Sequence, residues 1–383
     1  MKLEPLPFRS TVDQYQQQAA QFLEACRSGD TEAIQIIHKN HPRFLDDKIA
    51  WLPKDLPDSE IQNAGLDLAD LQLTLARWYG FPSWPALAQW ADAVRQDGSP
   101  VAQFESAVEA VIGGDLAALQ SLLRENPELV RARSTRVTPH HPPQHRATLL
   151  HYIAANGVEG YRQKTPPNAV DVAKTLLQAG AEVDALADMY EGQYTTMSML
   201  VSSCHPAKAG VQAALAETLL DFGAAIEGVG SETWGSSLKT ALAFGYLETA
   251  EALVRRGARV DNIATAAGLG RMSDAARLLP TADAESRHRA LALSAQHGHL
   301  EIVRLLLDAG EDPGRYNLDG NHGHSTPLHQ AVIAGHDAVV RLLVERGANL
   351  DIKDKIYQGT PLGWARHAGQ TEIEKYLRTK GAR

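Results

Sequence analysis

Two histidine-containing segments hold residue types that could bind a metal ion or transfer a proton. The first contains His140, His141 and His145, and the second contains Asp319, His322 and His324. A zinc site needs about four fixed nitrogen, oxygen or sulfur ligands. Neither segment supplies four ligands locally, and the only two cysteines, Cys26 and Cys204, are far apart. We therefore expect no metal site and no cofactor.

A few acidic groups could join a histidine in general acid–base catalysis. The candidates are Glu191, Glu232, Asp319 and His324. Such catalysis requires the groups to converge on a closed pocket. The sequence has no nucleophile elbow and no phosphate-binding glycine loop, and its Gly-Leu-Gly at 268–270 follows a helical pattern, which excludes a dinucleotide fingerprint. An enzyme or small-molecule sensor with Glu232, Asp319 and His324 as catalytic residues is therefore the alternative prediction.

Cys204 is followed directly by His205, which are the residue types of a nucleophile and its base. Neighbouring residues on a helix point to different sides, so the two side chains do not face each other. We expect a distorted helix with a buried thiol here.

Four aromatic residues lie in segments that connect the expected helices, namely Tyr190, Tyr194, Trp234 and Tyr357. Exposed aromatic residues on loops dominate the binding energy of protein interfaces. We expect them to anchor a partner or ligand, with packing between neighbouring loops as the open alternative. The polar groups of the predicted binding surface are Glu191, Glu232, Asp319, His322 and His324.

The elements that position these loops follow a recurring glycine pattern. Two glycines twelve residues apart enclose a leucine-rich run at Gly245–Gly257, and the spacing returns at Gly298–Gly310, Gly335–Gly347 and Gly369–Gly381. Glycine after a helix takes a left-handed turn without steric cost. Leu and Val at helical spacing between the glycines predict short helices, each buried on one face.

A second motif precedes two of these blocks. Thr326-Pro327-Leu328-His329 lies nine residues before Gly335, and Thr360-Pro361-Leu362-Gly363 lies nine before Gly369. Together the two motifs resemble the ankyrin repeat, a turn followed by two short antiparallel helices. The resemblance, to bacterial ankyrin-repeat proteins, extends over nearly the whole chain. It implies that His151 and His329 tie each turn to its neighbour through hydrogen bonds.

Several predicted units depart from the regular repeat. A shortened unit spans Ile263 to about Glu285, and the connecting loops at 131–147, 185–196, 228–237 and 316–325 are enlarged. Insertions at 158–168 and before Ala214 lengthen two neighbouring helix-to-helix turns, which could together form a lip over the concave face or over the opposite edge. His299 and His336, each after a mid-repeat glycine, are expected to be surface residues over the start of a helix.

The N-terminal part lacks the regular glycine spacing and is rich in aromatic residues. The segment 68–94 contains Trp78, Tyr79, Trp84 and Trp90, which we interpret as the core of a small helical module. Phe22–Ile37 reads as a degenerate repeat unit that caps the stack, as solenoids require. With a linker at 97–100, the predicted domains are a helical module over 1–97 and a solenoid of about seven or eight units over 103–383.

Composition narrows the partner class. The formal net charge of -9 argues against nucleic acid, whose binding rests on clustered Lys and Arg. The scarcity of cysteine favours a reducing compartment. No secretion signal and no apolar run of about 18 residues is present, so we expect a cytoplasmic protein with no membrane contact.

The sequence thus predicts an all-α fold, an ankyrin-repeat solenoid with an N-terminal helical module. We expect a non-enzymatic recognition scaffold, because the repeat motif specifies architecture and leaves chemistry open. We call the loops that connect successive helix pairs finger loops. A protein partner would bind the concave face of the solenoid and its enlarged finger loops, and a small molecule is the second possible ligand.

Overall fold

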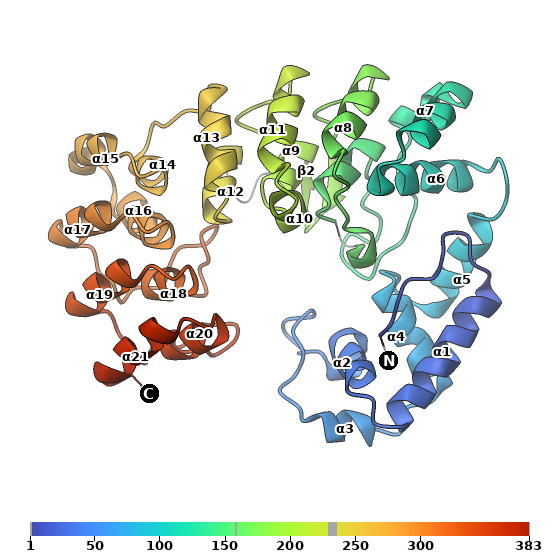
Figure 1. Cartoon of the computed structure of the whole chain (residues 1–383), viewed down its shortest axis with the longest axis horizontal. Coiled ribbons are helices and arrows are strands. Elements are labelled where there is room, and N and C mark those ends of the chain that lie inside the picture. The colour runs from blue at the N-terminus through green and yellow to red at the C-terminus, as the bar shows by residue number, and fades with distance from the viewer. Residues whose placement is uncertain (1, 158, 229–235, 383) are drawn as a thin grey trace. The chain divides into compact units, whose positions relative to one another are not determined.

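The computed structural model describes residues 2–157, 159–228 and 236–382 (Figure 1). The described residues form two compact units, unit 1 up to Ala224 and unit 2 from Ala225 onward. The predicted boundary between residues 97 and 103 lies inside unit 1. Every helix within the described ranges is too short or too polar to span a membrane.

Unit 1 is helical apart from one small hairpin. Its α-helices are α1 (Val12–Arg27), α2 (Thr31–Asn40), α3 (Asp58–Gln62), α4 (Leu68–Trp78), α5 (Trp84–Ala93), α6 (Pro100–Gly113), α7 (Leu116–Glu125), α8 (Ala169–Gln178), α9 (Thr196–Leu200), α10 (Cys204–Lys208) and α11 (Gln212–Asp221). Its 3-10 helices are η1 (Pro42–Phe44), η2 (Pro127–Arg131), η3 (Leu149–Ala154) and η4 (Gly160–Arg162). The antiparallel hairpin consists of β1 (Ala187–Met189) and β2 (Gly192–Tyr194).

The N-terminal helices α1–α5 pack around the predicted aromatic core. Tyr79 and Trp90 are buried there beside Tyr15 and Phe81. A capping box between Thr11 and Gln14 starts α1 by satisfying backbone N–H groups that the first turn leaves free. The prediction of an aromatic-centred helical module is confirmed.

Helix pairs continue along the rest of unit 1. The first helices α6, η3 and α9 pack one on the next, and the second helices α7, α8 and α11 form a parallel row (Figure 1). Gly114 ends α6 in the left-handed conformation that the glycine pattern predicts.

The enlarged loop 131–147 and the described part of the insertion, residues 159–168, send two arginines into the core. The Arg162 guanidinium lies 2.7 Å from Glu105 and 2.9 Å from Glu159, and all three side chains are buried. Arg136 stacks 3.9 Å above the Phe81 ring of the N-terminal module. Buried charges of this kind persist only when they are paired.

Unit 2 consists of helix pairs throughout its described residues. They are α12 (Ser237–Ala243), α13 (Leu247–Arg255), α14 (Ile263–Gly268), α15 (Met272–Leu278), η5 (Leu279–Thr281), α16 (Ala284–Gln296), α17 (Leu300–Asp308), α18 (Pro327–Ile333), α19 (Asp337–Glu345), α20 (Pro361–His367) and α21 (Thr371–Thr379). The inner row runs α14, α16, α18, α20, and the outer row runs α15, α17, α19, α21 (Figure 1). The all-α fold class and the shortened unit α14–α15 are confirmed.

Histidines bridge neighbouring repeats in unit 2. His299 Nε2 lies 3.0 Å from the carbonyl oxygen of Gly268, and His336 Nε2 lies 2.9 Å from that of Gln296. Each of these carbonyls belongs to the end of the preceding inner helix, where it lacks a partner within the helix. His299 and His336 lie at the start of a helix, as expected, but they are half-buried because their rings reach between the repeats.

His329 makes the contacts that the repeat motif implies. Its Nδ1 accepts the backbone N–H of Thr326 at 3.3 Å, and its Nε2 donates to the carbonyl oxygen of Gly359 in the next finger loop at 3.2 Å. His151 repeats the arrangement with Thr148 and Tyr194. The prediction of structural histidines at both positions is confirmed.

Leu306 tests the stacking of the repeats, because its side chain is 0% exposed between α17 and its neighbours. We predict that Leu306→Ala lowers the free energy of unfolding by about 2–5 kcal/mol by leaving a cavity. The partly exposed neighbour Leu305 provides the matched control, and Leu305→Ala should cost clearly less. Urea denaturation measures both, and a loss under about 0.5 kcal/mol for Leu306→Ala would contradict the assigned register.

The structural histidines predict a loss of stability in mild acid. Burial lowers the pKa of His329, His151 and His297 to about 4, against 6.5 in the unfolded chain. The unfolded state therefore takes up protons first, so stability is complete above pH 6.5 and falls as the pH drops toward 4. Thermal unfolding at a series of pH values should show this decline. The exposed His367 provides a control, since His367→Gln should leave the slope unchanged, and a flat profile would contradict the assignment.

Candidate functional site

A pocket of about 600 Å³ opens on unit 2 between the last two finger loops and helices α18 and α20. We call it the Tyr357 pocket. Its lining includes His322, His324, Ile333, Tyr357, Trp364 and His367. The lining is predominantly apolar and aromatic, and a few convergent polar groups are typical of binding sites with such a lining.

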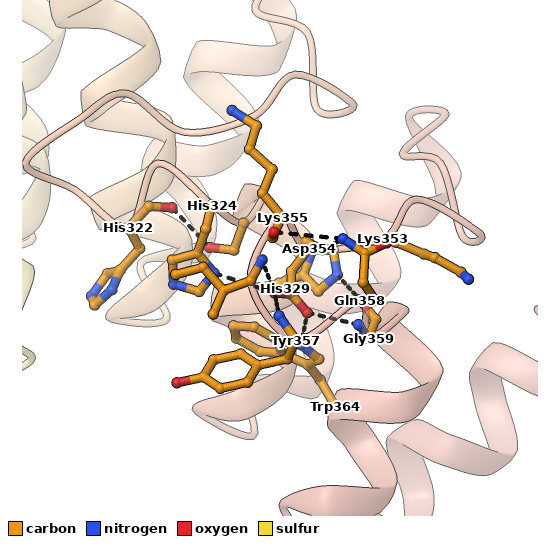
Figure 2. A network of polar contacts seen from close by, with 12 residues as sticks. His322, His324, His329, Lys353, Asp354, Lys355, Tyr357, Gln358, Gly359 and Trp364 are labelled. Atoms are coloured by element: carbon orange, nitrogen blue, oxygen red, sulfur yellow. Dashed lines mark hydrogen bonds and ion pairs between the residues drawn. The ribbon is translucent and has the colours of Figure 1, made fainter. Parts of the chain in front are cut away.

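Asp354 holds the finger loop that carries Tyr357 (Figure 2). Its carboxylate accepts the backbone N–H groups of Ile356, Tyr357 and Gly359 at 2.9, 2.6 and 2.8 Å. It also accepts the indole N–H of Trp364 at 3.1 Å, which ties the loop to α20. Burial opposes ionisation of Asp354, but these donors, the Tyr357 N–H first among them, hold its pKa below the ordinary value.

Aromatic rings form a continuous row along this surface. Phe244, at the end of α12, lies 6.4 Å from His322, and His322 lies 6.2 Å from His324, measured between ring centroids. His324 continues the row to Tyr357 at 6.2 Å and to Trp364 at 5.9 Å. We call this row the aromatic ladder. It brings together residues from three separate parts of the chain.

Backbone contacts fix the orientation of the ladder. His322 Nε2 donates to the carbonyl oxygen of Ala243 at 2.7 Å, and the His322 backbone has a left-handed φ of 55°. Burial lowers the pKa of His322, so the ring is held neutral as a donor. His324 Nδ1 lies 3.6 Å from the Asp354 carboxylate, which allows an ion pair when the ring is protonated. The ladder is therefore built on contacts between repeats, and the contact of His322 with Ala243 joins a loop before α18 to the end of α12.

Three of the predicted site residues meet in this pocket, namely His322, His324 and Tyr357. Tyr357 is 59% exposed, as expected of an anchor residue. Asp319 is exposed and is not among the lining residues, and its backbone carbonyl accepts a hydrogen bond from Arg289 at 2.7 Å. Of the four acid–base candidates, His324 is thus the one that the described residues place in the pocket.

The hairpin of unit 1 carries three further predicted residues. Tyr190 is 48% exposed, and its hydroxyl donates to Asn156 at 3.3 Å. Glu191 is exposed at the turn. Tyr194 is only 7% exposed, so its assignment as an exposed anchor is wrong. Side chains alternate between the two faces of a strand, and Tyr194 falls on the buried face of β2.

Two predicted residues, Glu232 and Trp234, lie outside the described residues. The expectation of a buried thiol at Cys204 is wrong, since this residue begins the short helix α10 and is exposed. Within the described residues, no three His, Cys, Asp or Glu side chains come together at a spacing that could hold a metal ion.

Asp354, Trp364 and His367 were missed by reasoning from sequence. The role of Asp354 could have been predicted from the sequence, because Asp followed closely by Gly is typical of a loop in which the carboxylate accepts backbone N–H groups. Trp364 and His367 lie on α20, and only the packing of α20 against the preceding finger loop reveals that they face the pocket.

Comparison with known proteins identifies the repeats. Residues 262–354 and 291–383 match the family described as "Ankyrin repeats (3 copies)". Residues 262–383 are therefore ankyrin repeats. The Tyr357 pocket and most of the aromatic ladder lie within these ankyrin repeats, and Phe244 lies just before them.

Individual relatives match parts of the chain. Ankyrin repeat and SAM domain-containing protein 6 of Mus musculus is 37% identical over 103 residues, 27% of this chain and 11% of that protein. Protein PhlB of Serratia liquefaciens is 36% identical over 72 residues, 19% of this chain and 30% of that protein. The chain thus spans only a small part of the relatives it matches, and they come from both eukaryotes and bacteria.

Asp354→Asn tests how the pocket is held together. The amide nitrogen of Asn would face N–H donors in place of one carboxylate oxygen, so we predict a loss of about 1–3 kcal/mol in the free energy of unfolding. Urea denaturation measures this loss. Asp319→Asn is the matched control at an exposed carboxylate and should change stability by less than about 0.5 kcal/mol. Equal effects of the two substitutions would contradict the role given to Asp354.

Proposed function

We propose that this chain is a recognition scaffold whose unit 2 binds a protein partner at the Tyr357 pocket and along the aromatic ladder. Ankyrin repeats are typical protein-interaction modules, which supports the general function. The exposed Tyr357 and Ile333 beside a pocket of about 600 Å³ are the observation that carries the specific proposal.

The chemistry of the pocket favours an apolar anchor on the partner. Aromatic side chains at the centre of an interface contribute most of the binding energy, surrounded by contacts that exclude water. Imidazole rings and the Gln330 amide at the pocket wall offer hydrogen bonds that orient such an anchor. The bound partner would therefore insert a bulky apolar side chain between Tyr357 and Trp364.

Net charge does not select the partner of unit 2. Residues 225–383 contain 19 Lys and Arg and 19 Asp and Glu, whereas residues 1–224 contain 18 and 27. The whole negative balance of the chain thus belongs to the N-terminal part. Long-range electrostatic steering scales with net charge, so we expect recognition by unit 2 to depend on shape and apolar contact.

A small-molecule sensor or enzyme is the second candidate function. The volume of the Tyr357 pocket falls within the ~300–1,000 Å³ range of ligand sites, which is the observation in its favour. His324 next to Asp354 is the pair that could move a proton there.

Affinity capture with the full chain tests the proposal. We predict that a protein retained by the wild type is lost at least ~10-fold with Tyr357→Ser as bait, because the anchor contact is removed. Ile333→Ser should weaken capture in the same direction.

Trp51→Ser is the matched control, since Trp51 is an exposed aromatic residue of unit 1 and its loss should leave capture unchanged. Mass spectrometry of the same eluates for both proteins and small molecules separates the two candidates. A protein retained equally by the wild type and Tyr357→Ser, or a small molecule as the only ligand that depends on Tyr357, would refute the proposal.

A further inference from the structure

The aromatic ladder extends the Tyr357 pocket into a longer apolar surface. Phe244, His322, His324 and Trp364 are each partly exposed, and Tyr357 is exposed. The three steps from Phe244 to Tyr357 measure 6.4, 6.2 and 6.2 Å between ring centroids, so the ladder is at most about 19 Å long. A polyproline II segment rises about 3.1 Å per residue, so about six residues in this conformation span the ladder.

Successive rings of the ladder stand at steep angles to each other. The angle between ring planes is 63° for Phe244 and His322, 85° for His322 and His324, and 80° for His324 and Tyr357. In such edge-to-face pairs the face of one ring lies beside the edge of the next, which leaves a notch at each step. Proline rings are compact and apolar, and proline-rich segments bind to aromatic-lined grooves. Each notch is therefore a place for a proline ring.

The surface of the ladder is uncharged. Among the residues that the structure describes, the lining of the Tyr357 pocket includes no Lys, Arg, Asp or Glu. The Asp354 carboxylate is 0% exposed and accepts N–H groups of its own loop. Figure 2 shows the side chains of Lys353 and Lys355 pointing away from Tyr357. A charged segment would lose its hydration here without meeting an opposite charge, so we expect an uncharged occupant.

The polar groups beside the rings favour a segment with free backbone carbonyl groups. The described residues of unit 2 contain no strand, so a partner has no sheet edge there with which to pair. A helix uses its backbone carbonyl groups internally and offers few of them to the Tyr357 hydroxyl and the exposed His367 ring. A polyproline II segment keeps these carbonyl groups free, and its prolines lose little conformational entropy on binding because their φ angle is already fixed.

We infer that the partner of the Tyr357 pocket is a proline-rich segment in the polyproline II conformation, with one bulky apolar residue among its prolines. The apolar residue enters the pocket between Tyr357 and Trp364, and the prolines lie in the notches that lead to Phe244. This inference rests on the proposed function and adds the sequence class and the conformation of the bound segment.

Titration of the full chain with fluorescently labelled peptides, read by anisotropy, tests the inference. The probe contains one leucine between two runs of six prolines, so that either chain direction can cover the ladder. A matched peptide keeps the leucine and replaces the prolines by glycine and serine. We expect saturable binding of the proline probe and at least ~10-fold weaker binding of the matched peptide, because the flexible chain must be ordered on binding. An uncharged peptide of the same length that forms a helix around one leucine should also bind more weakly.

Two variants locate the bound segment. Tyr357→Ser should weaken binding of the proline probe by at least ~10-fold, and Phe244→Ser, at the other end of the ladder, by at least ~3-fold. Phe222→Ser is the matched control. Phe222 follows the last residue of α11 as Phe244 follows that of α12, and it is exposed in unit 1, so its loss should leave binding unchanged.

The comparison of the peptides on the wild-type chain does not depend on how any variant folds. Absence of saturable binding of the proline probe, equal binding of the glycine–serine or helical peptide, or unchanged binding of the probe by Tyr357→Ser or Phe244→Ser overturns the inference. A captured protein that depends on Tyr357 but binds through a segment without proline overturns the inference and leaves the proposed function intact. A capture experiment without any protein that depends on Tyr357 refutes the proposed function itself.

Discussion

Each helix pair of unit 2 has an apolar face that only the next pair can cover, and the rest of the structure depends on this constraint. Leu306, Leu343 and Leu377 occupy the same position in successive outer helices, and all three are fully buried. Because burial comes from neighbours, each finger loop takes its place from the repeats on either side. Loops far apart in sequence are thereby brought to one surface.

Hydrogen bonds then fix the positions of the helix ends and finger loops within the stack that apolar burial forms. His299 and His336 satisfy carbonyl groups at the ends of preceding helices, and His329 links its own helix start to the next finger loop. Asp354 performs the same task inside the last finger loop and ties it to Trp364. These hydrogen bonds also fix the aromatic ladder, because its rings are held by the contacts that connect the repeats. The proposed recognition surface and the stability of the repeats therefore depend on the same side chains in this part of the molecule.

In unit 1, buried ion pairs add to the apolar contacts between helix pairs. Its helix pairs are interrupted by an enlarged loop and an insertion, and the arginines on these segments pair with Glu105 and Glu159 in the interior. Paired buried charges add little net stability, but breaking one pair is costly because it leaves an uncompensated charge. The ion cluster thus fixes where the loop and the insertion lie.

The repeats and the helix ends could be predicted from the sequence because the glycine spacing acts locally. The roles of His151 and His329 followed from the resemblance to ankyrin repeats. The aromatic core around Trp90 was likewise predictable from residue type. The burial of Tyr194, the bridging by His299 and the pocket contribution of Trp364 depend on which neighbour each residue meets, and spacing alone does not contain that information. Arg136 and Arg162 show the same limit, since a charged residue in a long loop is normally exposed.

Hydrogen exchange on the full chain, with and without its captured protein partner, tests the central claim most directly. The account predicts that binding slows exchange at the backbone amides of residues 322–325 and 354–359, where the finger loops meet at the Tyr357 pocket. Protection confined to the outer helices α15, α17, α19 and α21, or to unit 1 alone, would contradict it.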